Sequence, residues 1–278
     1  MKVVLFCGGF GMRLRGYSES IPKPLVTVGD IPILLQIMQY YASFGHKEFI
    51  LCLGWKAESF RSYFTDHPEG GPLTTCPGFF NDSIALKCEF RDWTVSFIDT
   101  GMHACVGERL KQLEPILKNE DYFYANYADG LCNVDLDSLT AMHLNSDSHA
   151  TFVSVAPTQS FHTVNSLLNG DVVSIDAIAK QGVWINGGFF VLSGDFFEYM
   201  DFGEELVEEP FRRLIDQKKL KTYRHDGFWA CMDTYKEMQL LEEMNSRGET
   251  PWAIWQANIP TVFNFDTVTD PPEFTKPS

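Results

Sequence analysis

Short apolar runs and longer amphipathic stretches alternate along the first part of the chain. Residues 3–7 are a continuous run of β-branched and other apolar residues, and in the segment 48–53 such a run follows Glu48. Both runs are typical of strands buried on both faces. Residues 32–44 carry apolar side chains at three-to-four spacing and predict a helix, as do residues 57–64. Strand, helix, strand, helix in this order predicts an α/β fold with a parallel sheet.

Shorter elements follow. Residues 65–82 are rich in Pro, Gly, Thr and Asp and predict a loop. Further strands are predicted at residues 84–90, 93–98, 122–125, 150–156 and 185–192, and within 162–175. Further helices are predicted at residues 107–117, 136–144, 208–218 and 233–246. Residues 256–278 contain four prolines and no period, which predicts an extended surface arm or a partly disordered tail.

Composition narrows the classes of partner. The 278 residues are 45% hydrophobic and 21% charged, which suits a globular protein with a sizeable core. With 37 acidic and 22 basic residues the net charge is −15, which argues against a nucleic-acid partner. Residues 1–23 are the exception, because they hold four basic residues and one acidic residue. An anionic ligand is therefore expected at the N-terminal segment.

The cysteines and the hydropathy predict a cytoplasmic protein. The seven cysteines are odd in number and none stands at zinc-site spacing, so reduced thiols are expected. No apolar run approaches the roughly 18 residues that span a bilayer. Glycines interrupt the apolar start of the chain, which disfavours a secretory signal.

A glycine loop directly follows the first predicted strand, where ligands bind in parallel α/β sheets. Gly8, Gly9 and Gly11 lack the third glycine of a dinucleotide fingerprint, because Leu14 stands at that position. The loop also lacks the Gly-Lys-Ser/Thr of a Walker motif. Its backbone N–H groups could approach an anion, and Arg13 could clamp phosphate oxygens. A tight turn with solvated arginines explains the glycines equally well.

Lys23 makes phosphate binding the better interpretation. It stands between Pro22 and Pro24, which fix the backbone on either side and lower the entropy lost in presenting an ammonium group.

The glycine loop and the Pro-Lys-Pro segment together resemble the signature of the sugar nucleotidyltransferases, also called NDP-sugar pyrophosphorylases. Further segments resemble the cytidylyltransferases of this family in order and spacing, over residues 1–255. These segments are residues 32–34, 99–101, 107–111, 186–192, 227–229, 232–234 and 251–255. The resemblance implies a Rossmann-like, mixed and mainly parallel sheet flanked by helices, of the GT-A-like type. It also implies a nucleotide-binding part at about 1–150, a smaller β-rich acceptor-binding part at about 151–255, and an extension at 256–278.

The resemblance implies that a sugar 1-phosphate attacks the α-phosphorus of CTP, or of another pyrimidine NTP, and forms a CDP-sugar and pyrophosphate. Such a nucleophile needs no strong base, because a phosphate monoester with a second pKa of about 6 is mostly dianionic at neutral pH. Mg²⁺ is the implied cofactor, with Asp129 and Asp233 as its ligands. Asp-Gly is also a plain turn signal, and Asp233 also fits a helix N-cap. A homo-oligomer is implied, with neither nucleic acid nor membrane as partner.

The resemblance also implies the residues that bind the nucleotide. They are Gly8, Gly9, Gly11, Met12, Arg13, Lys23, Gly107, Arg109 and Asp129. Arg13 and Lys23 are the implied catalytic residues. Met12 replaces the usual threonine, and Arg109 fits a helix-surface charge as well as it fits a contact to the pyrimidine.

The acceptor side departs from the family pattern. Asn186 resembles the sugar-hydroxyl ligand, with Gly187 and Trp229 as further acceptor residues, although Asn-Gly is also a strong turn signal. The usual acceptor-phosphate lysine is missing unless Lys180 replaces it, and His162 is either a new ligand or an ordinary hydrogen-bonded histidine. We therefore expect an acceptor other than simple glucose 1-phosphate.

Three alternatives stay open at this point. The same chemistry could use UTP or dTTP, or a non-sugar phosphate as acceptor. The chain could also be a non-catalytic, nucleotide-binding regulatory protein. Asp129 and Asp233 favour an enzyme, because a binding module has less need of two metal carboxylates.

Overall fold

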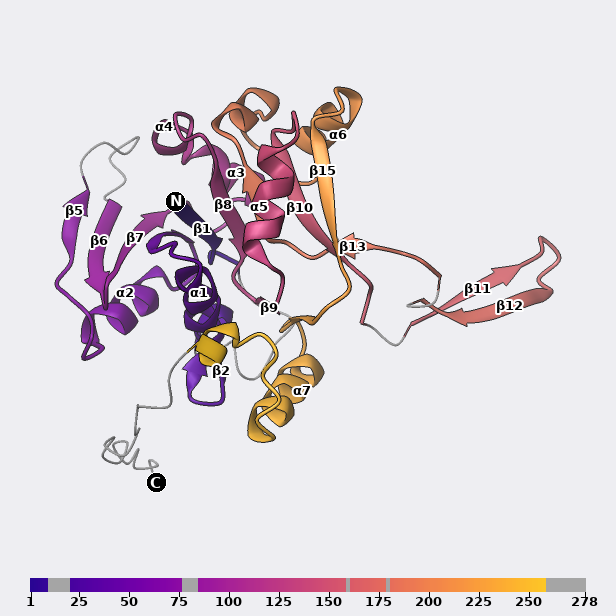
Figure 1. Ribbon diagram of the computed structural model, residues 1–278, viewed down its shortest axis with the longest axis horizontal. Coiled ribbons are helices and arrows are strands. Elements are labelled where there is room, and N and C mark those ends of the chain that lie inside the picture. Colours follow the sequence, from indigo (N-terminus) through magenta and orange to yellow (C-terminus); the bar gives the residue numbers. More distant parts are fainter. Residues whose placement is uncertain (10–20, 77–84, 159–160, 179–180, 259–278) are drawn as a thin grey trace.

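A ten-stranded mixed sheet forms the centre of the molecule, with helices on both faces (Figure 1). The computed structural model describes residues 1–9, 21–76, 85–158, 161–178 and 181–258. The strands of the sheet are β1 (Lys2–Phe6), β4 (Glu48–Leu53), β5 (Thr74–Cys76), β6 (Ala85–Phe90), β7 (Trp93–Asp99), β8 (Phe123–Tyr127), β10 (Ala150–Val155), β13 (Ile185–Asn186), β14 (Phe190–Leu192) and β15 (Leu220–His225). Their order is β13-β10-β14-β8-β1-β4-β7-β6-β5, with β15 paired to β10. The predicted α/β fold is confirmed.

The middle of the sheet is parallel. Strand β1 pairs in parallel with β4 and with β8, and β4 pairs in parallel with β7. Val3 and Leu5 of β1 point into one buried core, whereas Val4 and Phe6 point into the other. This strand is buried on both faces, which explains its continuous apolar run. The carboxyl ends of the four parallel strands consequently meet at one edge of the sheet.

The helices divide between the two faces. They are α1 (Ile33–Ser43), α2 (Ala57–Asp66), α3 (Val106–Lys111), α4 (Glu114–Leu117), α5 (Leu136–Leu144), α6 (Glu209–Asp216) and α7 (Tyr235–Ser246), with 3-10 helices η2 (Lys23–Leu25), η4 (Gly194–Tyr199) and η5 (Ile254–Asn258). Helices α1, α2 and α5 pack on one core, and α3, α4, α6 and η4 pack on the other.

Some predicted boundaries are wrong. The single helix predicted at residues 107–117 is two helices, because Pro115 has no N–H to continue the ladder. Strand β5 lies inside the loop predicted at 65–82, and the polar strand β15 and the short strand β16 (Trp229–Cys231) were not predicted. Each of these strands is short or polar, so its pairing depends on neighbours rather than on its own pattern.

Three pairs of strands lie outside the main sheet. Strand β2 (Thr27–Val28) pairs with β3 (Ile31–Pro32), and β9 (Gly130–Cys132) pairs with β16. Strands β11 (His162–Ser166) and β12 (Val172–Ala177) form an antiparallel hairpin that projects far from the body of the molecule (Figure 1). Within the described part of the chain, no helix is long and apolar enough to cross a membrane.

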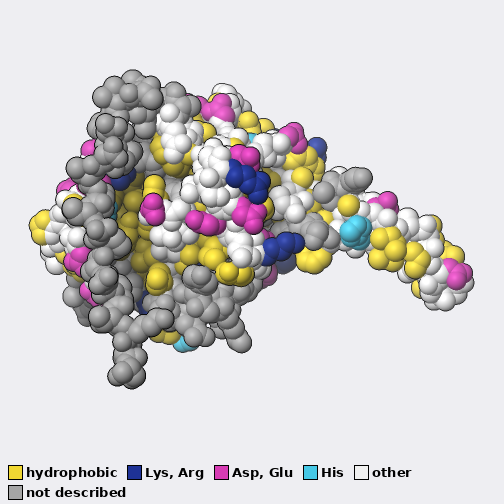
Figure 2. Space-filling model, turned by 90° about the horizontal axis from the view of Figure 1, so that it is seen from below, with side chains coloured by type: hydrophobic (Ala, Val, Ile, Leu, Met, Phe, Trp, Pro, Cys, Tyr) yellow, Lys and Arg dark blue, Asp and Glu magenta, His cyan; other side chains and the backbone are white. Residues whose placement is uncertain are grey.

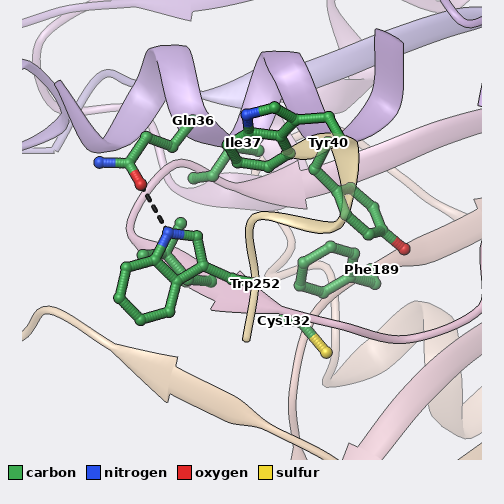
Figure 3. Close-up of a pocket in the computed structure, with 9 residues that line it drawn as sticks. Gln36, Ile37, Tyr40, Cys132, Phe189 and Trp252 are labelled. Atoms are coloured by element: carbon green, nitrogen blue, oxygen red, sulfur yellow. Dashed lines mark hydrogen bonds between the residues drawn. The ribbon is translucent and has the colours of Figure 1, made fainter. Parts of the chain in front are cut away.

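The closing segment of the described chain is tied to α1. The indole Nε1 of Trp252 donates to the Gln36 side-chain oxygen at 2.6 Å, and both residues line a crevice with Gly130 (Figure 3). The Gln36 Nε2 in turn donates to the carbonyls of Val28 and Ile31 at 3.0 Å. The crevice leaves no room for a water molecule, so it is packing rather than a ligand site. It supports the backbone next to Asp129.

Candidate active site

Arg109 ties together three neighbouring strand ends. Its guanidinium donates to the Gly8 carbonyl after β1 at 3.1 Å and to the Leu53 carbonyl of β4 at 3.1 Å. It also donates to the Thr100 hydroxyl at 2.7 Å and to the Gly101 carbonyl at 2.8 Å, both after β7. Arg109 is only 4% exposed, so its reading as a surface charge is wrong.

This arrangement explains the first glycine of the loop. A Cβ on Gly8 would lie 2.0 Å from the nearest guanidinium nitrogen of Arg109, so that position has no space for a side chain. A Cβ on Gly9 would have nothing within 4 Å. Gly8 therefore permits the close approach of Arg109, whereas Gly9 is exposed at the sheet edge. Nucleotide binding by these residues stays a prediction.

Lys23, Asp129 and Asp233 converge at the same edge of the sheet. The Lys23 ammonium lies 2.5 Å from a carboxylate oxygen of Asp129 and 2.5 Å from one of Asp233. The Lys23 side chain is 12% exposed, and the two carboxylates are 27% and 33% exposed. Residues more than 200 positions apart in sequence thus form one cluster that solvent can reach.

The β9–β16 pair brings the two carboxylates together. Cys231 pairs with Gly130, and the Met232 N–H donates to the Asp129 carbonyl at 2.8 Å. Asp129 immediately precedes β9, and Asp233 stands two residues after the end of β16. Thr234, rather than Asp233, is the N-cap of α7, with a capping box to Glu237. The N-cap interpretation of Asp233 is therefore wrong, and its carboxylate faces Lys23 instead.

The two carboxylates already hold a cation between them. Burial alone would lower the pKa of Lys23, but the Asp129 and Asp233 carboxylates outweigh burial, so the pKa is raised. No group of three or more His, Cys, Asp or Glu side chains gathers for a metal among the described residues. Two carboxylates fit Mg²⁺, which takes one or two protein carboxylates and completes its shell with water and phosphate oxygens.

Asn186 stands at the end of β13 and contacts the strand that precedes Asp129. Its side-chain NH₂ donates to the Tyr127 hydroxyl at 3.1 Å, and its side-chain oxygen accepts from the Gly188 N–H at 2.9 Å. Trp229 of β16 donates its indole N–H to the Gly187 carbonyl at 2.8 Å. Since β16 also pairs with β9, these contacts connect the Asn-Gly-Gly turn to the backbone that carries Asp129.

The turn depends on a residue that sequence reasoning missed. Gly188 and Phe189 have φ of 78° and 50°, and the Asn126 side-chain oxygen accepts from the Phe189 N–H at 3.0 Å. A Cβ on Gly188 would lie 2.6 Å from that oxygen. Asn126 and Tyr127 belong to the strand before Asp129, and a polar residue inside an apolar strand is the signal that could have identified Asn126.

The other predicted site residues lie elsewhere or outside the described chain. Gly107 lies in α3, where a Cβ would be 2.2 Å from the Glu204 carbonyl, so it permits close packing of that helix. His162 begins the projecting hairpin and is exposed, and its side chain makes no hydrogen bond or ion pair within the described ranges. Four predicted residues fall outside the described ranges: Gly11, Met12, Arg13 and Lys180.

Known proteins with similar sequences include proteins named as glucose-1-phosphate cytidylyltransferases. No model of a protein family matches the sequence. The glucose-1-phosphate cytidylyltransferase of Salmonella typhimurium is 32% identical over 258 residues, which is 92% of this chain and 100% of that protein. A Bacillus subtilis protein with the same enzyme in its name is 33% identical over 257 residues, with the same coverage of both chains.

Solved structures agree on the fold. A UDP-glucose pyrophosphorylase of Acinetobacter baumanii superimposes with a TM-score of 0.63 at 16% identity, covering 92% of this chain and 96% of that one. The relatives and the fold agree. This chain belongs to the sugar nucleotidyltransferase family and is related over nearly its whole length to glucose-1-phosphate cytidylyltransferases.

Proposed function

We propose that the protein transfers a cytidylyl group from CTP to a sugar 1-phosphate, forming a CDP-sugar and pyrophosphate. The observation that carries this proposal is the convergence of Lys23, Asp129 and Asp233 at the carboxyl edge of the parallel strands. The relatives, which are cytidylyltransferases by name, support CTP as the nucleotide and a CDP-sugar as the product.

The reaction depends more on stabilising negative charge on the phosphates than on transferring a proton. A phosphate oxygen of the acceptor forms a bond to the α-phosphorus of CTP, while the bond from that phosphorus to the α,β-bridging oxygen breaks and this oxygen leaves with pyrophosphate. The acceptor phosphate is already mostly dianionic at neutral pH, so no general base is needed. The protein must bring two polyanions together and stabilise the charge that develops on the α- and β-phosphates.

Lys23 and the two carboxylates have different parts in this stabilisation. Mg²⁺, held by Asp129 and Asp233, would neutralise phosphate charge and orient the phosphate oxygens when bound. The carboxylates would then no longer need Lys23 as their counter-ion, and its ammonium would be free to contact the phosphates. The prolines beside Lys23 restrict its backbone, so the lysine stays near both positions. Divalent-metal use is general in this family, and Mg²⁺ is our specific proposal.

Release of pyrophosphate tests the proposal directly. The protein would be incubated with Mg²⁺, each of CTP, UTP, dTTP, ATP and GTP, and a panel of hexose 1-phosphates. We expect release with CTP and at least one sugar 1-phosphate. Efficient turnover of glucose 1-phosphate would contradict the expectation of an altered acceptor. CTP binding without release on any acceptor would instead identify a regulatory protein.

Two further predictions belong to this proposal. We place the protein in the reducing cytoplasm, and free thiols support this: Cys7, Cys52, Cys88, Cys105, Cys132 and Cys231. A homo-oligomer is also proposed, and light scattering with size-exclusion chromatography measures it. Seven large apolar residues of the hairpin region are exposed in the single chain: Phe161, Val164, Leu167, Leu168, Val172, Val173 and Ile175. Figure 2 shows apolar side chains along the projecting hairpin.

A further inference from the structure

An arginine outside the site described above lies against an aromatic ring at the same edge of the sheet. The guanidinium of Arg224, on β15, is 5.2 Å from the centre of the Trp184 ring. Arg224 is exposed, and no carboxylate of the described residues forms an ion pair with it. Stacking on an indole orients a guanidinium and leaves its N–H groups available to an anion.

The strand register places Arg224 in one row with Asn186. Ser154 of β10 pairs with Asn186 of β13 on one side and with Arg224 of β15 on the other. Residues in register point to the same face of a sheet. With about 4.8 Å between neighbouring strands, the Asn186 and Arg224 backbones are about 10 Å apart. Trp184 precedes Asn186 by two residues, so Arg224 leans across β10 toward the chain segment that carries both Trp184 and Asn186.

The row has hydrogen-bonding capacity that the protein does not use. The Ser154 hydroxyl is buried and has no hydrogen-bond partner among the described residues. A buried polar group without a partner is costly unless a ligand or water satisfies it. Asn186, at the other end of the row, is held by Tyr127, the last residue of β8, which lies two positions before Asp129. The row therefore begins next to β8, the strand that leads to Asp129, and extends away from that strand toward β15.

This order determines which part of an acceptor could reach Arg224. The proposed function, on which this inference rests, places the reacting phosphate at Asp129 and Asp233. The body of the acceptor then passes Asn186, and its far end meets Trp184 and Arg224. We infer that Arg224 recognises a second anionic group, a carboxylate or a second phosphate, at the end of the acceptor opposite the reacting phosphate.

Three acceptors and one pair of variants test this inference. The acceptors are glucose 1-phosphate, glucuronic acid 1-phosphate and glucose 1,6-bisphosphate, which differ in the charge at the far end. Arg224→Gln removes the cation, whereas Lys221→Gln removes an exposed cation from the opposite face of the same strand. The readouts are kcat/KM with CTP and, independently of turnover, the Kd of each acceptor by calorimetry.

We expect the unaltered protein to prefer one of the two doubly anionic acceptors over glucose 1-phosphate by at least about tenfold. Arg224→Gln should remove that preference through KM and Kd, and should leave glucose 1-phosphate and kcat little changed. Lys221→Gln should change nothing, and the identity of the preferred compound separates carboxylate from phosphate.

Two results would overturn the inference while leaving the proposed function intact. One is turnover without preference for an anionic acceptor, and the other is a preference that survives in Arg224→Gln. Failure of the proposed function has a different appearance, because no acceptor would then release pyrophosphate. In that case the Kd values still test the role of Arg224. That role is rejected if each doubly anionic compound binds the unaltered protein and Arg224→Gln with equal Kd, or if neither compound binds at all.

Discussion

The sheet edge that carries Lys23, Asp129 and Asp233, here called the carboxylate edge, differs from the β11–β12 hairpin in how its polar side chains are positioned. At the edge, Lys23 is largely buried and contacts two carboxylates that arrive from distant parts of the sequence. On the hairpin, His162 is exposed, as are apolar side chains of the same two strands such as Val173, which is 67% exposed. The comparison teaches that residue type alone does not make a site. A paired backbone ladder positions the first group, whereas the second lies on a surface that no other described residue of the single chain covers.

The largest expected effect concerns the two carboxylates. Asp129→Asn and Asp233→Asn should each lower kcat by about 10²–10³-fold, because each removes half of the charge that would hold the metal. Asp226→Asn, an exposed carboxylate in the loop before β16, is the matched control and should keep full activity. Steady-state pyrophosphate release measures all three. Normal activity in Asp129→Asn would mean that the edge is not the reaction centre.

Lys23→Met tests the role of the lysine at the carboxylate edge. We expect turnover to fall by about 10²-fold, since the ammonium no longer contacts the phosphates. Affinity for Mn²⁺ without nucleotide should rise, because the lysine that occupies the space between the carboxylates is gone. Electron paramagnetic resonance of free Mn²⁺ measures this, with Lys221→Met as the control. Unchanged Mn²⁺ affinity would separate the lysine from the metal position.

The region that carries Lys23 and Asp129 was the more predictable part of the molecule. Lys23, Asp129 and the first parallel strands each carry a local signal, namely proline flanks, an Asp-Gly pair and continuous apolar runs. Parallel topology brings the strand ends, and Asp129 just beyond one of them, to one edge, and η2 brings Lys23 to Asp129 there.

Other parts of the site have no local signal. The four hydrogen bonds of Arg109 depend on three strand ends, and the row of Asn186, Ser154 and Arg224 depends on the register of strands that sequence periodicity did not reveal. Short or polar strands such as β15 form because a neighbour pairs with them. Their side chains can therefore be placed only once the sheet is known.

Gly8→Ala and Gly9→Ala separate a packed glycine from an exposed one at the same edge. The new Cβ at position 8 would displace the Arg109 guanidinium and disrupt its four hydrogen bonds. We expect a loss of about 2–3 kcal/mol in the free energy of unfolding, and roughly tenfold weaker CTP binding. Gly9→Ala should cost less than about 0.5 kcal/mol. Urea denaturation and calorimetry provide the values, and equal effects at both positions would contradict the role of Arg109.

The smallest effect is expected on the hairpin. Val173→Ser removes an exposed apolar side chain and should change the free energy of unfolding of the isolated chain by less than about 0.5 kcal/mol. Val153→Ser, in the fully buried part of β10, should cost about 2–3 kcal/mol, because it places a hydroxyl in an apolar core. Urea denaturation at several protein concentrations compares them. A concentration-dependent loss in Val173→Ser, with a lower mass by light scattering, would show that a second copy covers the hairpin, since only burial gives that side chain an energetic role.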